Sequence, residues 1–460
     1  MIPKLVPLLS GLVPFSRALQ VANLNISQST AAEYGCNSIC YENFQIGLAI
    51  DATLYGAIYD AEFYETASNF SSSKPGDVLK LKPINATLQS DIPAGTTAYK
   101  FQYVSKNIYS KNVPVTGFIA FPYASRTNGQ KYRAIAYAHG TSGVFRGCAP
   151  SAMPNLYDYG SWSFILQRGY AIIATDYAGL GNNYTPHHYQ ASPAQAHDLY
   201  YSVAAAQSLF GGSLTTEWMS VGHSQGGGAV WALAESPLLR ENPLCLGEYL
   251  GTVAQAPGVR LKEIALLAVQ AATSSSSSDI VSVRAVLGEF GWLVLGLRSI
   301  TPEDSQRWLQ PTFKKRLELA ELAQACYASA QSLVADLDIE DVVDLSDTTL
   351  FDALDVMQNL TARGDGKSRQ PVLVVQGLAD ALVLPKAVET SYNASCQSGN
   401  EVHLQLYPGL DHTPVIPASA PSFLQWIDDR FDGVRTTGQC SNDTIQPFDS
   451  VNMYAPKGTD

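Results

Sequence analysis

The sequence predicts an α/β protein whose central sheet is mostly parallel and is covered by helices on both faces. Apolar β-type runs alternate with helical stretches along most of the 460-residue chain. The later runs lack a polar face, which is typical of strands buried on both sides. A long helical stretch between Pro257 and Pro371 interrupts the alternation. We therefore expect a helical lid inserted into the sheet domain.

The first two strands are expected to pair antiparallel, because only a turn-like stretch separates them. Ser192, Pro193 and Gln195 predict an N-cap, a first-turn proline and a capping-box partner for the longest helix before the insertion. The predicted strands are 97–105, 115–123, 133–140, 170–181, 217–227, 249–257, 371–380 and 402–409. The predicted helices that cover them are 161–169, 192–210, 228–236 and 420–431.

A chain of this length accommodates one large α/β domain with an insertion. Within the insertion, a serine run at 274–278 marks a flexible join. The apolar run at 281–297 contains Arg284 and Glu289, so it predicts a buried or lid helix and not a membrane span. The expected segments are a signal peptide (1–18), an N-terminal extension (19–92), the sheet domain (93–258 and 367–435), the helical lid (259–366) and a C-terminal tail (436–460).

The first residues are typical of a secretory signal peptide. Lys4 precedes an apolar run at 5–15, and the small residues Ser16 and Ala18 follow it. The alternative is a disordered or packed N-terminal tail, and the run is too short to span a bilayer. An excess of N-glycosylation sequons also favours secretion, so we expect an extracellular protein. The candidate acceptors are Asn25, Asn69, Asn85, Asn183, Asn359, Asn393 and Asn442.

The cysteine content agrees with an oxidising compartment. Seven cysteines would leave one odd thiol if most of them are paired. Cys36 and Cys40 are close in sequence, but no His or Cys cluster completes a zinc site with them, so a local disulfide is the better interpretation. No metal and no cofactor are expected.

Charge narrows the range of partners. The formal net charge is −12, and the sequence is 46% hydrophobic and 15% charged. These values are typical of a globular chain with an acidic surface. They argue against nucleic acid and anionic membranes as partners, and leave small-molecule substrates open.

The stretch VGHSQGGGAV places Ser224 in a G-x-S-x-G pattern at a predicted junction of strand and helix. This is the setting of the nucleophile elbow of α/β-hydrolases, where a sharp turn exposes a serine at the edge of the sheet. Gly222 and Gly226 would let strand and helix approach each other. A glycine-rich turn with an idle serine is the alternative. We interpret Ser224 as a nucleophile.

A serine nucleophile needs a base that an acid orients, in the chain order Ser, Asp or Glu, His. Asp380 follows an apolar strand, and His412 is the only histidine that follows the last strand. Asp176 also ends a strand but precedes the serine, and Asp411 adjoins the histidine in a geometry that rarely suits the role. The predicted triad is Ser224, Asp380 and His412, with a surface-loop histidine as the alternative for His412.

The oxyanion hole of such a site needs two donors. One is expected to be the backbone N–H of Gln225, the residue after the nucleophile. The other should come from the loop HGTSG, where Thr141 is the first choice and Gly140 or Ser142 are close alternatives. A simple tight turn at this loop is the competing interpretation.

Several motifs together resemble the fungal and bacterial secretory lipase family of the lipase A type. They are HGTSGVFRGCAPS (139–151), GHSQGGG (222–228), GLAD (377–380), DHTP (411–414) and SKPGDVLKLKP (73–83). The resemblance covers about residues 60–435. It implies an α/β-hydrolase core with a helical lid, acyl-ester hydrolysis, and the disulfides Cys148–Cys326 and Cys396–Cys440.

Two features depart from that family pattern. His223 stands where the family often has an aromatic residue before the nucleophile, and the region of Cys36 and Cys40 is additional. Both departures bear on the substrate preference.

The sequence therefore predicts a secreted serine esterase or lipase that acts on lipid or other acyl esters through an acyl-enzyme. Transient contact with a lipid interface is part of this hypothesis. An acyltransferase with an alcohol or amine acceptor would use the same triad, as would a peptidase, which the lid and the resemblance disfavour. A binding protein on an inactive hydrolase scaffold is the non-enzymatic alternative, and the complete triad argues against it.

Overall fold

A computed structural model describes residues 26–55, 59–85, 92–126, 131–273, 291–301 and 306–456. Three features expected from the sequence lie outside these residues: the signal peptide at 1–18, the acceptor Asn25 and the serine run at 274–278. The apolar run at 281–297 is described only from residue 291, and residues 291–300 are helical.

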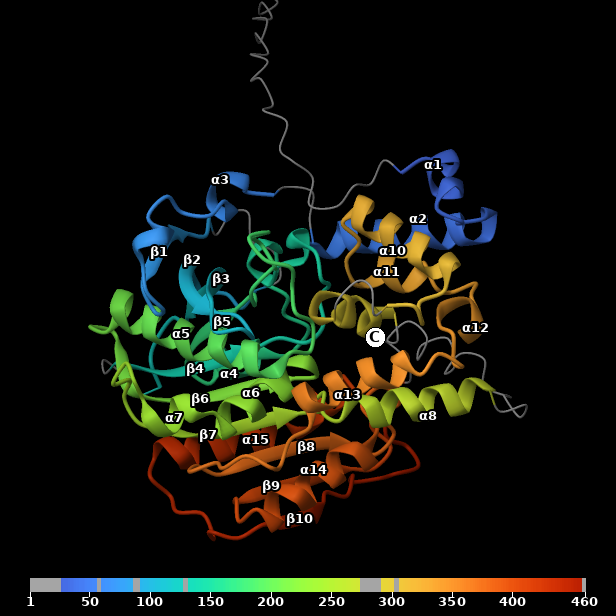
Figure 1. The fold of residues 1–460 in the computed structure, drawn as a ribbon. Coiled ribbons are helices and arrows are strands. Elements are labelled where there is room, and N and C mark those ends of the chain that lie inside the picture. The colour runs from blue at the N-terminus through green and yellow to red at the C-terminus, as the bar shows by residue number, and fades with distance from the viewer. Residues whose placement is uncertain are drawn as a thin grey trace, which may run out of the picture.

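The described strands form one ten-stranded sheet in the order β1-β2-β3-β5-β4-β6-β7-β8-β9-β10 (Figure 1). β1, β2, β3 and β5 are antiparallel to their neighbours in that order, and from β5 onward all neighbours are parallel. This arrangement confirms the predicted fold class. The strands are β1 (Val78–Pro83), β2 (Thr97–Lys106), β3 (Asn112–Phe121), β4 (Tyr132–Ala138), β5 (Ala171–Thr175), β6 (Leu214–His223), β7 (Tyr249–Gln255), β8 (Val372–Gly377), β9 (Val402–Tyr407) and β10 (Ser441–Thr444).

All eight predicted strands form, and β2 and β3 make the predicted antiparallel pair. The sequence did not predict the two edge strands. β1 comes from the segment expected to be an extension, and β10, from the expected tail, pairs with β9. Both are half-buried or exposed throughout, so they lack the apolar runs by which the other strands were recognised.

Helices cover both faces of the sheet. Leu199 in α5, Trp231 in α6 and Val388 in α14 pack in one core, and Trp162 in α4 and Phe423 in α15 pack in the other. Each of these residues is fully buried. The helices are α4 (Trp162–Gln167), α5 (Ser192–Phe210), α6 (Gln225–Glu235), α14 (Pro385–Gln397) and α15 (Val415–Phe431).

The capping box predicted for α5 is wrong. The helix begins at Ser192, Ala191 is its N-cap, and no side chain caps it. Both polar atoms of the Gln195 amide are buried without a hydrogen-bond partner. Ser192 is itself the first helical residue and Pro193 the second, so the serine lies one position too late to act as the N-cap.

Between β7 and β8 the described chain is helical and has a core of its own. Trp308, Phe313 and Leu354 are among its buried residues. The described elements are α8 (Leu261–Thr273), residues 291–300, α10 (Pro311–Ala323), α11 (Tyr327–Ser332), α12 (Ile339–Val342) and α13 (Thr349–Thr361). We call these elements the inserted helices.

The N-terminal helices α1 (Gln28–Glu33) and α2 (Ser38–Tyr55) pack against the inserted helices (Figure 1). Phe44 and Leu48 of α2 share a buried cluster with Leu319 of α10 and Leu333. The two N-terminal helices therefore complete the inserted helices.

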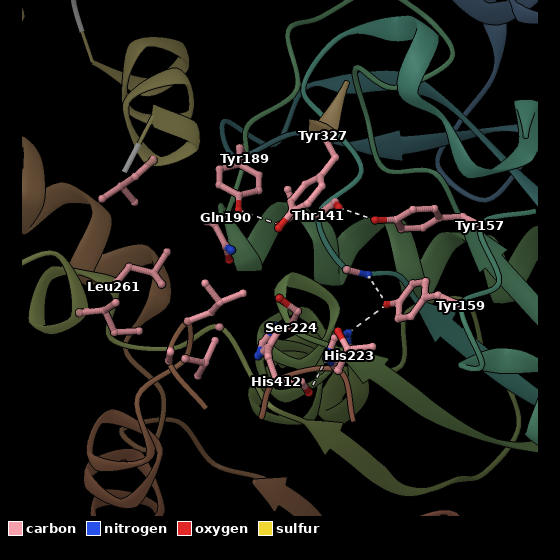
Figure 2. Close-up of a pocket in the computed structure, with 18 of the residues that line it drawn as sticks. Thr141, Tyr157, Tyr159, Tyr189, Gln190, His223, Ser224, Leu261, Tyr327 and His412 are labelled. Atoms are coloured by element: carbon pink, nitrogen blue, oxygen red, sulfur yellow. Dashed lines mark hydrogen bonds between the residues drawn. The ribbon is translucent and has the colours of Figure 1, made fainter. Parts of the chain in front are cut away.

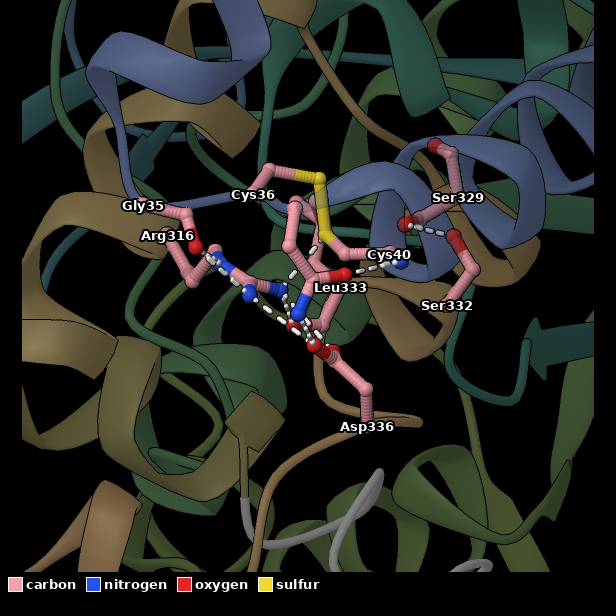
Figure 3. Close-up of a disulfide and its surroundings, with 9 residues drawn as sticks. Gly35, Cys36, Cys40, Arg316, Ser329, Ser332, Leu333 and Asp336 are labelled. Carbon is pink, nitrogen blue, oxygen red and sulfur yellow. Dashed lines mark hydrogen bonds and ion pairs between the residues drawn. A yellow bond between two sulfur atoms is a disulfide. The ribbon is translucent and has the colours of Figure 1, made fainter.

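Polar contacts fix this packing. Arg316 on α10 donates to the carbonyl oxygens of Gly35 (2.8 Å) and Leu333 (2.9 Å), and its guanidinium pairs with Asp336 (Figure 3). Asp51 on α2 is buried and accepts hydrogen bonds from the first turn of α11, including the N–H groups of Cys326 and Ser329. A buried carboxylate that satisfies several donors holds two elements in one register, because moving either leaves polar groups unpaired.

Three disulfides join the expected pairs. Cys36–Cys40 closes the turn between α1 and α2, as Figure 3 shows. Cys148–Cys326 ties the loop after β4 to α11, and Cys396–Cys440 ties α14 to the chain just before β10. Cys245 is the odd thiol; it is free and exposed.

No described helix is long and apolar enough to cross a membrane. The six candidate glycosylation acceptors within the described residues all have exposed side chains, as glycan attachment requires. They are Asn69, Asn85, Asn183, Asn359, Asn393 and Asn442.

Candidate active site

Ser224 lies at the sharp junction between β6 and α6. Its backbone has φ 58° and ψ −119°, a conformation that costs a non-glycine residue of the order of 1–3 kcal/mol. The Ser224 N–H donates to the carbonyl of Gln255 at 2.9 Å, which holds the turn against β7. His223 and Gln225 are buried, whereas Ser224 itself is partly exposed. The predicted elbow is present, and it presents the serine side chain to solvent.

Two glycines allow this turn. A Cβ added to Gly222 would lie 2.3 Å from the carbonyl oxygen of Gly226, and one added to Gly226 would lie 2.0 Å from that of Ala138. Both contacts are with backbone atoms, which cannot rotate away. Strand and helix therefore approach within a distance that no side chain permits.

Gly226→Ala is expected to lower the free energy of unfolding by more than about 3 kcal/mol, because the methyl group forces α6 away from β4. Urea denaturation measures the loss. The control is Gly212→Ala, where an added Cβ meets nothing within 4 Å and which should change stability little. Equal stability of the two variants would contradict the close packing at the elbow.

His412 and Asp380 meet beside Ser224. The Nδ1 atom of His412 lies 2.8 Å from Oδ2 of Asp380, and both side chains are buried. Asp380 also accepts from the Gln376 amide (3.0 Å) and from the N–H groups of Leu382 (3.0 Å) and Val383 (2.8 Å). Four donors surround the carboxylate, so its hydrogen-bonding capacity is satisfied and its orientation is fixed.

The two other aspartates considered for the acid of the triad make different hydrogen bonds. Asp411 accepts from the backbone N–H groups of Ala381 (3.2 Å) and His412 (2.8 Å), so it stabilises the loop that carries His412. Asp176 is buried and accepts from Ser151 and Thr116, and burial raises its pKa. These contacts give Asp176 a structural role away from His412.

A chain of hydrogen bonds connects the loop after β4 to the loop of His412. His223 Nε2 faces the carbonyl oxygen of His412 at 3.4 Å, so it carries the ring proton of a neutral imidazole. His223 Nδ1 then accepts from the Tyr159 hydroxyl at 3.0 Å, and that hydroxyl accepts from the N–H of Gly140 at 3.3 Å. Burial, with His412 nearby, holds the pKa of His223 well below its usual range, which keeps this arrangement neutral.

The loop after β4, expected to provide an oxyanion donor, is held by tyrosines. The Tyr157 hydroxyl donates to the carbonyl of Thr141 at 2.5 Å, and the Thr141 hydroxyl lies 2.8 Å from that of Tyr189. The carbonyl of Ser142 accepts from Tyr55 of α2 at 2.6 Å. Since the N–H of Gly140 already donates to Tyr159, it is less suited to stabilise an oxyanion than the sequence alone indicated.

The side chain of Gln225 is fixed by His187. The Gln225 amide nitrogen lies 3.0 Å from His187 Nε2, and His187 Nδ1 lies 3.0 Å from the carbonyl of Ala178. The carbonyl can only accept, so Nδ1 donates and Nε2 accepts, which makes the ring neutral. Burial lowers the pKa of His187 to about 3.

This buried histidine makes stability depend on pH. The unfolded chain binds a proton at His187 below about pH 6.5 and the folded chain does not, so this group lowers stability as pH falls. Asp51 and Asp198, whose pKa values burial raises to about 6 and about 7, act in the opposite direction because the folded chain retains their protons. Comparing the pH dependence of stability in the wild type and in a variant without this histidine therefore isolates the contribution of His187.

In His187→Gln, the free energy of unfolding should fall with decreasing pH less steeply than in the wild type, by about 1.4 kcal/mol per pH unit between pH 6.5 and 4. Urea denaturation at several pH values gives both slopes. Parallel curves for the two proteins would contradict a neutral His187 in the folded state.

Ser224, His223, His412 and Thr141 line one cavity of about 320 Å³ (Figure 2). Figure 2 shows Leu261 on one side of Ser224 and Tyr157 and Tyr159 on the other. The aliphatic wall consists of Leu261, Ile264 and Ala265 from α8, together with Leu293, Leu382 and Val383. The opposite wall is polar and aromatic and contains Asn155, Tyr157, Asp158 and Tyr159.

The sequence did not indicate these cavity-lining residues. The tyrosines lie in an irregular stretch after β4, and Leu54 and Tyr327 reach the cavity from α2 and α11. No local signal marks them, because only the tertiary packing brings them to the site. Within the described residues, no group of three or more His, Cys, Asp or Glu side chains could hold a metal ion.

Comparisons with known proteins relate this chain to secreted lipases. A family model described as secretory lipase matches residues 156–439. A secreted triacylglycerol lipase of Malassezia globosa is 21% identical over 405 residues, covering 83% of this chain and 81% of that protein.

Two solved structures share the fold. Candida antarctica lipase A is 15% identical, with a TM-score of 0.64 over 83% of this chain and 88% of that chain. A rice cell wall degrading esterase from Xanthomonas oryzae is 15% identical, with a TM-score of 0.59 over 79% of this chain and 100% of that chain.

Proposed function

Because this chain belongs to the secretory lipase family, whose model matches more than half of it, we propose that Ser224, His412 and Asp380 form its catalytic triad. The protein is a secreted carboxylic ester hydrolase. One observation carries the assignment of residues: the 2.8 Å contact between Asp380 and Nδ1 of His412, which lines the same cavity as the strained Ser224 elbow.

In the proposed reaction, the Ser224 hydroxyl attacks the carbonyl carbon of the ester while His412 Nε2 accepts its proton. Asp380 keeps Nδ1 protonated and stabilises the imidazolium that forms. His412 then gives the proton to the departing alkoxide, and the alcohol leaves an acyl group on Ser224. A water molecule attacks this acyl-enzyme in the same manner and releases the carboxylic acid.

The tetrahedral intermediate needs donors to its oxyanion. We assign this role to the backbone N–H groups of Gln225 and Thr141. Gln225 is the first residue of α6, where the helix dipole also favours negative charge. The tyrosine contacts of the Thr141 loop support the second donor, because they fix the loop before substrate binds.

The two walls of the cavity suggest how a lipid ester binds. The aliphatic wall would receive the acyl chain, and the polar wall with Asn155 and Asp158 would receive the alcohol group. The inserted helices provide much of the aliphatic wall, so we assign them the role of a lid. The M. globosa relative is named a triacylglycerol lipase, which agrees with an acylglycerol as substrate.

A series of p-nitrophenyl esters from acetate to palmitate tests this substrate class. We expect kcat/KM to rise from acetate to chains of medium or greater length, because each methylene buried on the aliphatic wall contributes about 0.8 kcal/mol. An optimum at acetate would contradict an acyl-binding aliphatic wall. Adding an alcohol and analysing the products separates hydrolysis from acyl transfer, and a predominance of the transferred ester would overturn hydrolysis as the main reaction.

A further inference from the structure

One face of α2 is apolar and exposed. Ile39, Ile46, Ile50 and Leu54 have exposed fractions of 63%, 61%, 45% and 44%. At 100° per residue, these four side chains lie within an arc of about 80° on the helix. We call this set the α2 stripe. Four large aliphatic side chains aligned on one helix and exposed to water are unusual on a soluble surface, where such residues are normally scattered.

The exposed surface of α2 itself is nearly uncharged. The other exposed residues of α2 are Ser38, Glu42, Ala49 and Thr53, so Glu42 is the only exposed charge on the helix. The second carboxylate of α2, Asp51, lies on the buried face of the helix, against α11. Helices that lie on anionic membranes carry lysine and arginine beside their apolar face, and this helix has none.

The stripe leads to the cavity that holds Ser224. Leu54, its last member, lines that cavity together with Ser224 and His412. The next residue, Tyr55, is buried and donates to the carbonyl of Ser142 in the proposed oxyanion loop. An apolar surface that touches α2 would therefore extend to the cavity without crossing a polar barrier on this helix.

Buried contacts and a disulfide fix the position of α2. Asp51 binds the first turn of α11, and the buried side chains of Phe44 and Leu48 pack against the inserted helices. The disulfide Cys36–Cys40 closes its N-terminal turn. A fixed helix can present the stripe without first ordering a segment, so binding does not lose free energy to that ordering.

We propose that the α2 stripe docks the enzyme on the surface of uncharged lipid ester and delivers acyl chains to the cavity at Leu54. This inference rests on the proposed function and adds the physical state of the substrate and the surface that recognises it. The continuity with the cavity through Leu54 favours lipid over another protein as the occupant. The lack of cations on the stripe and the net charge of −12 favour an uncharged surface over an anionic one.

The test compares Ile46→Ser/Ile50→Ser with the control Ile445→Ser. Ile445 is 39% exposed and follows β10, at the far end of the molecule from α2 (Figure 1). Binding is measured by flotation with a triolein emulsion coated with phosphatidylcholine, in a Ser224→Ala background so that no turnover occurs. The stripe variant is expected to bind about 10-fold or more weakly, and the control to bind like its parent.

Hydrolysis separates this inference from the proposed function. With Ser224 intact, the stripe variant should lose activity on emulsified triolein but keep it on dissolved p-nitrophenyl acetate, which also shows that it is folded. Loss of both activities in a correctly folded variant would show that the stripe acts on catalysis and would overturn docking. A wild type inactive on both esters would instead refute the proposed function.

Three other results would also overturn the proposal. The first is equal flotation of the stripe variant and the control. The second is a dimer that the stripe substitutions dissociate, which would make this face an interface between two copies of the chain. The third is stronger binding to vesicles rich in phosphatidylserine than to the neutral emulsion, since the stripe offers no cation to anionic lipid.

Discussion

Replacing Ser224 with alanine lowers kcat/KM for p-nitrophenyl esters by about 10⁵-fold or more, because the reaction loses its covalent intermediate. The strained turn around residue 224 is maintained by Gly222, Gly226 and the bond to Gln255, and alanine accepts the same backbone with little change. The variant should therefore be inactive and still folded. Activity near that of the wild type would refute Ser224 as the nucleophile.

The measurement needs evidence that the site itself is otherwise intact. Thermal unfolding of the variant should occur within a few degrees of that of the wild type, since Ser224 is partly exposed and the change removes a single oxygen atom. A fluorophosphonate probe, which reacts with activated serines, should label the wild type and not the variant. Labelling of the variant would identify another serine as the reactive one.

Replacing Asp380 with asparagine is expected to lower kcat by about 10³–10⁴-fold with a smaller change in KM. The carboxylate accepts from four donors: His412 Nδ1, Gln376, and the N–H groups of Leu382 and Val383. An amide offers only one oxygen, so its NH₂ group must face a donor in either orientation. If the oxygen satisfies the backbone, the NH₂ faces Nδ1, moves the ring proton to Nε2 and prevents that atom from accepting the serine proton.

Asp411 provides the matched control, because it is the neighbouring carboxylate on the same loop. It accepts from the backbone N–H of His412, whereas Asp380 contacts the imidazole Nδ1. Asp411→Asn should lower kcat by less than about 10-fold, because the substitution weakens only a contact within the loop. If Asp411→Asn is impaired as severely as Asp380→Asn, the assignment of the acid fails.

The sequence predicted the candidate site better than its surroundings. Ser224, Asp380 and His412 each follow a buried strand, and parallel strands present their carboxyl ends at one edge of the sheet. Local pattern and topology together were therefore sufficient to predict that these three residues lie close to one another. The hydrogen bonds of Tyr159 with His223 and Gly140 join loops far apart in sequence, and no local pattern encodes them.

The difference between local pattern and long-range contacts also explains which parts of the fold the sequence failed to predict. The strands β1 and β10 depend on pairing with a preformed sheet edge, and their own residues carry little apolar signal. The sequence of α2 indicated only a local disulfide at Cys36 and Cys40. Its packing on α10 and α11, and hence its place beside the cavity, depends on residues almost 300 positions later in the chain.

The packing of α2 on the inserted helices also sets an order of events during biosynthesis. α2 leaves the ribosome early, but the N–H groups that donate hydrogen bonds to Asp51 belong to residues 275 to 278 positions later in the chain. At about 5–20 residues per second, their synthesis takes roughly 15–55 s longer. During that interval the buried face of α2 lacks its partners from α10 and α11, so α2 reaches its final place only after the greater part of the hydrolase has been translated.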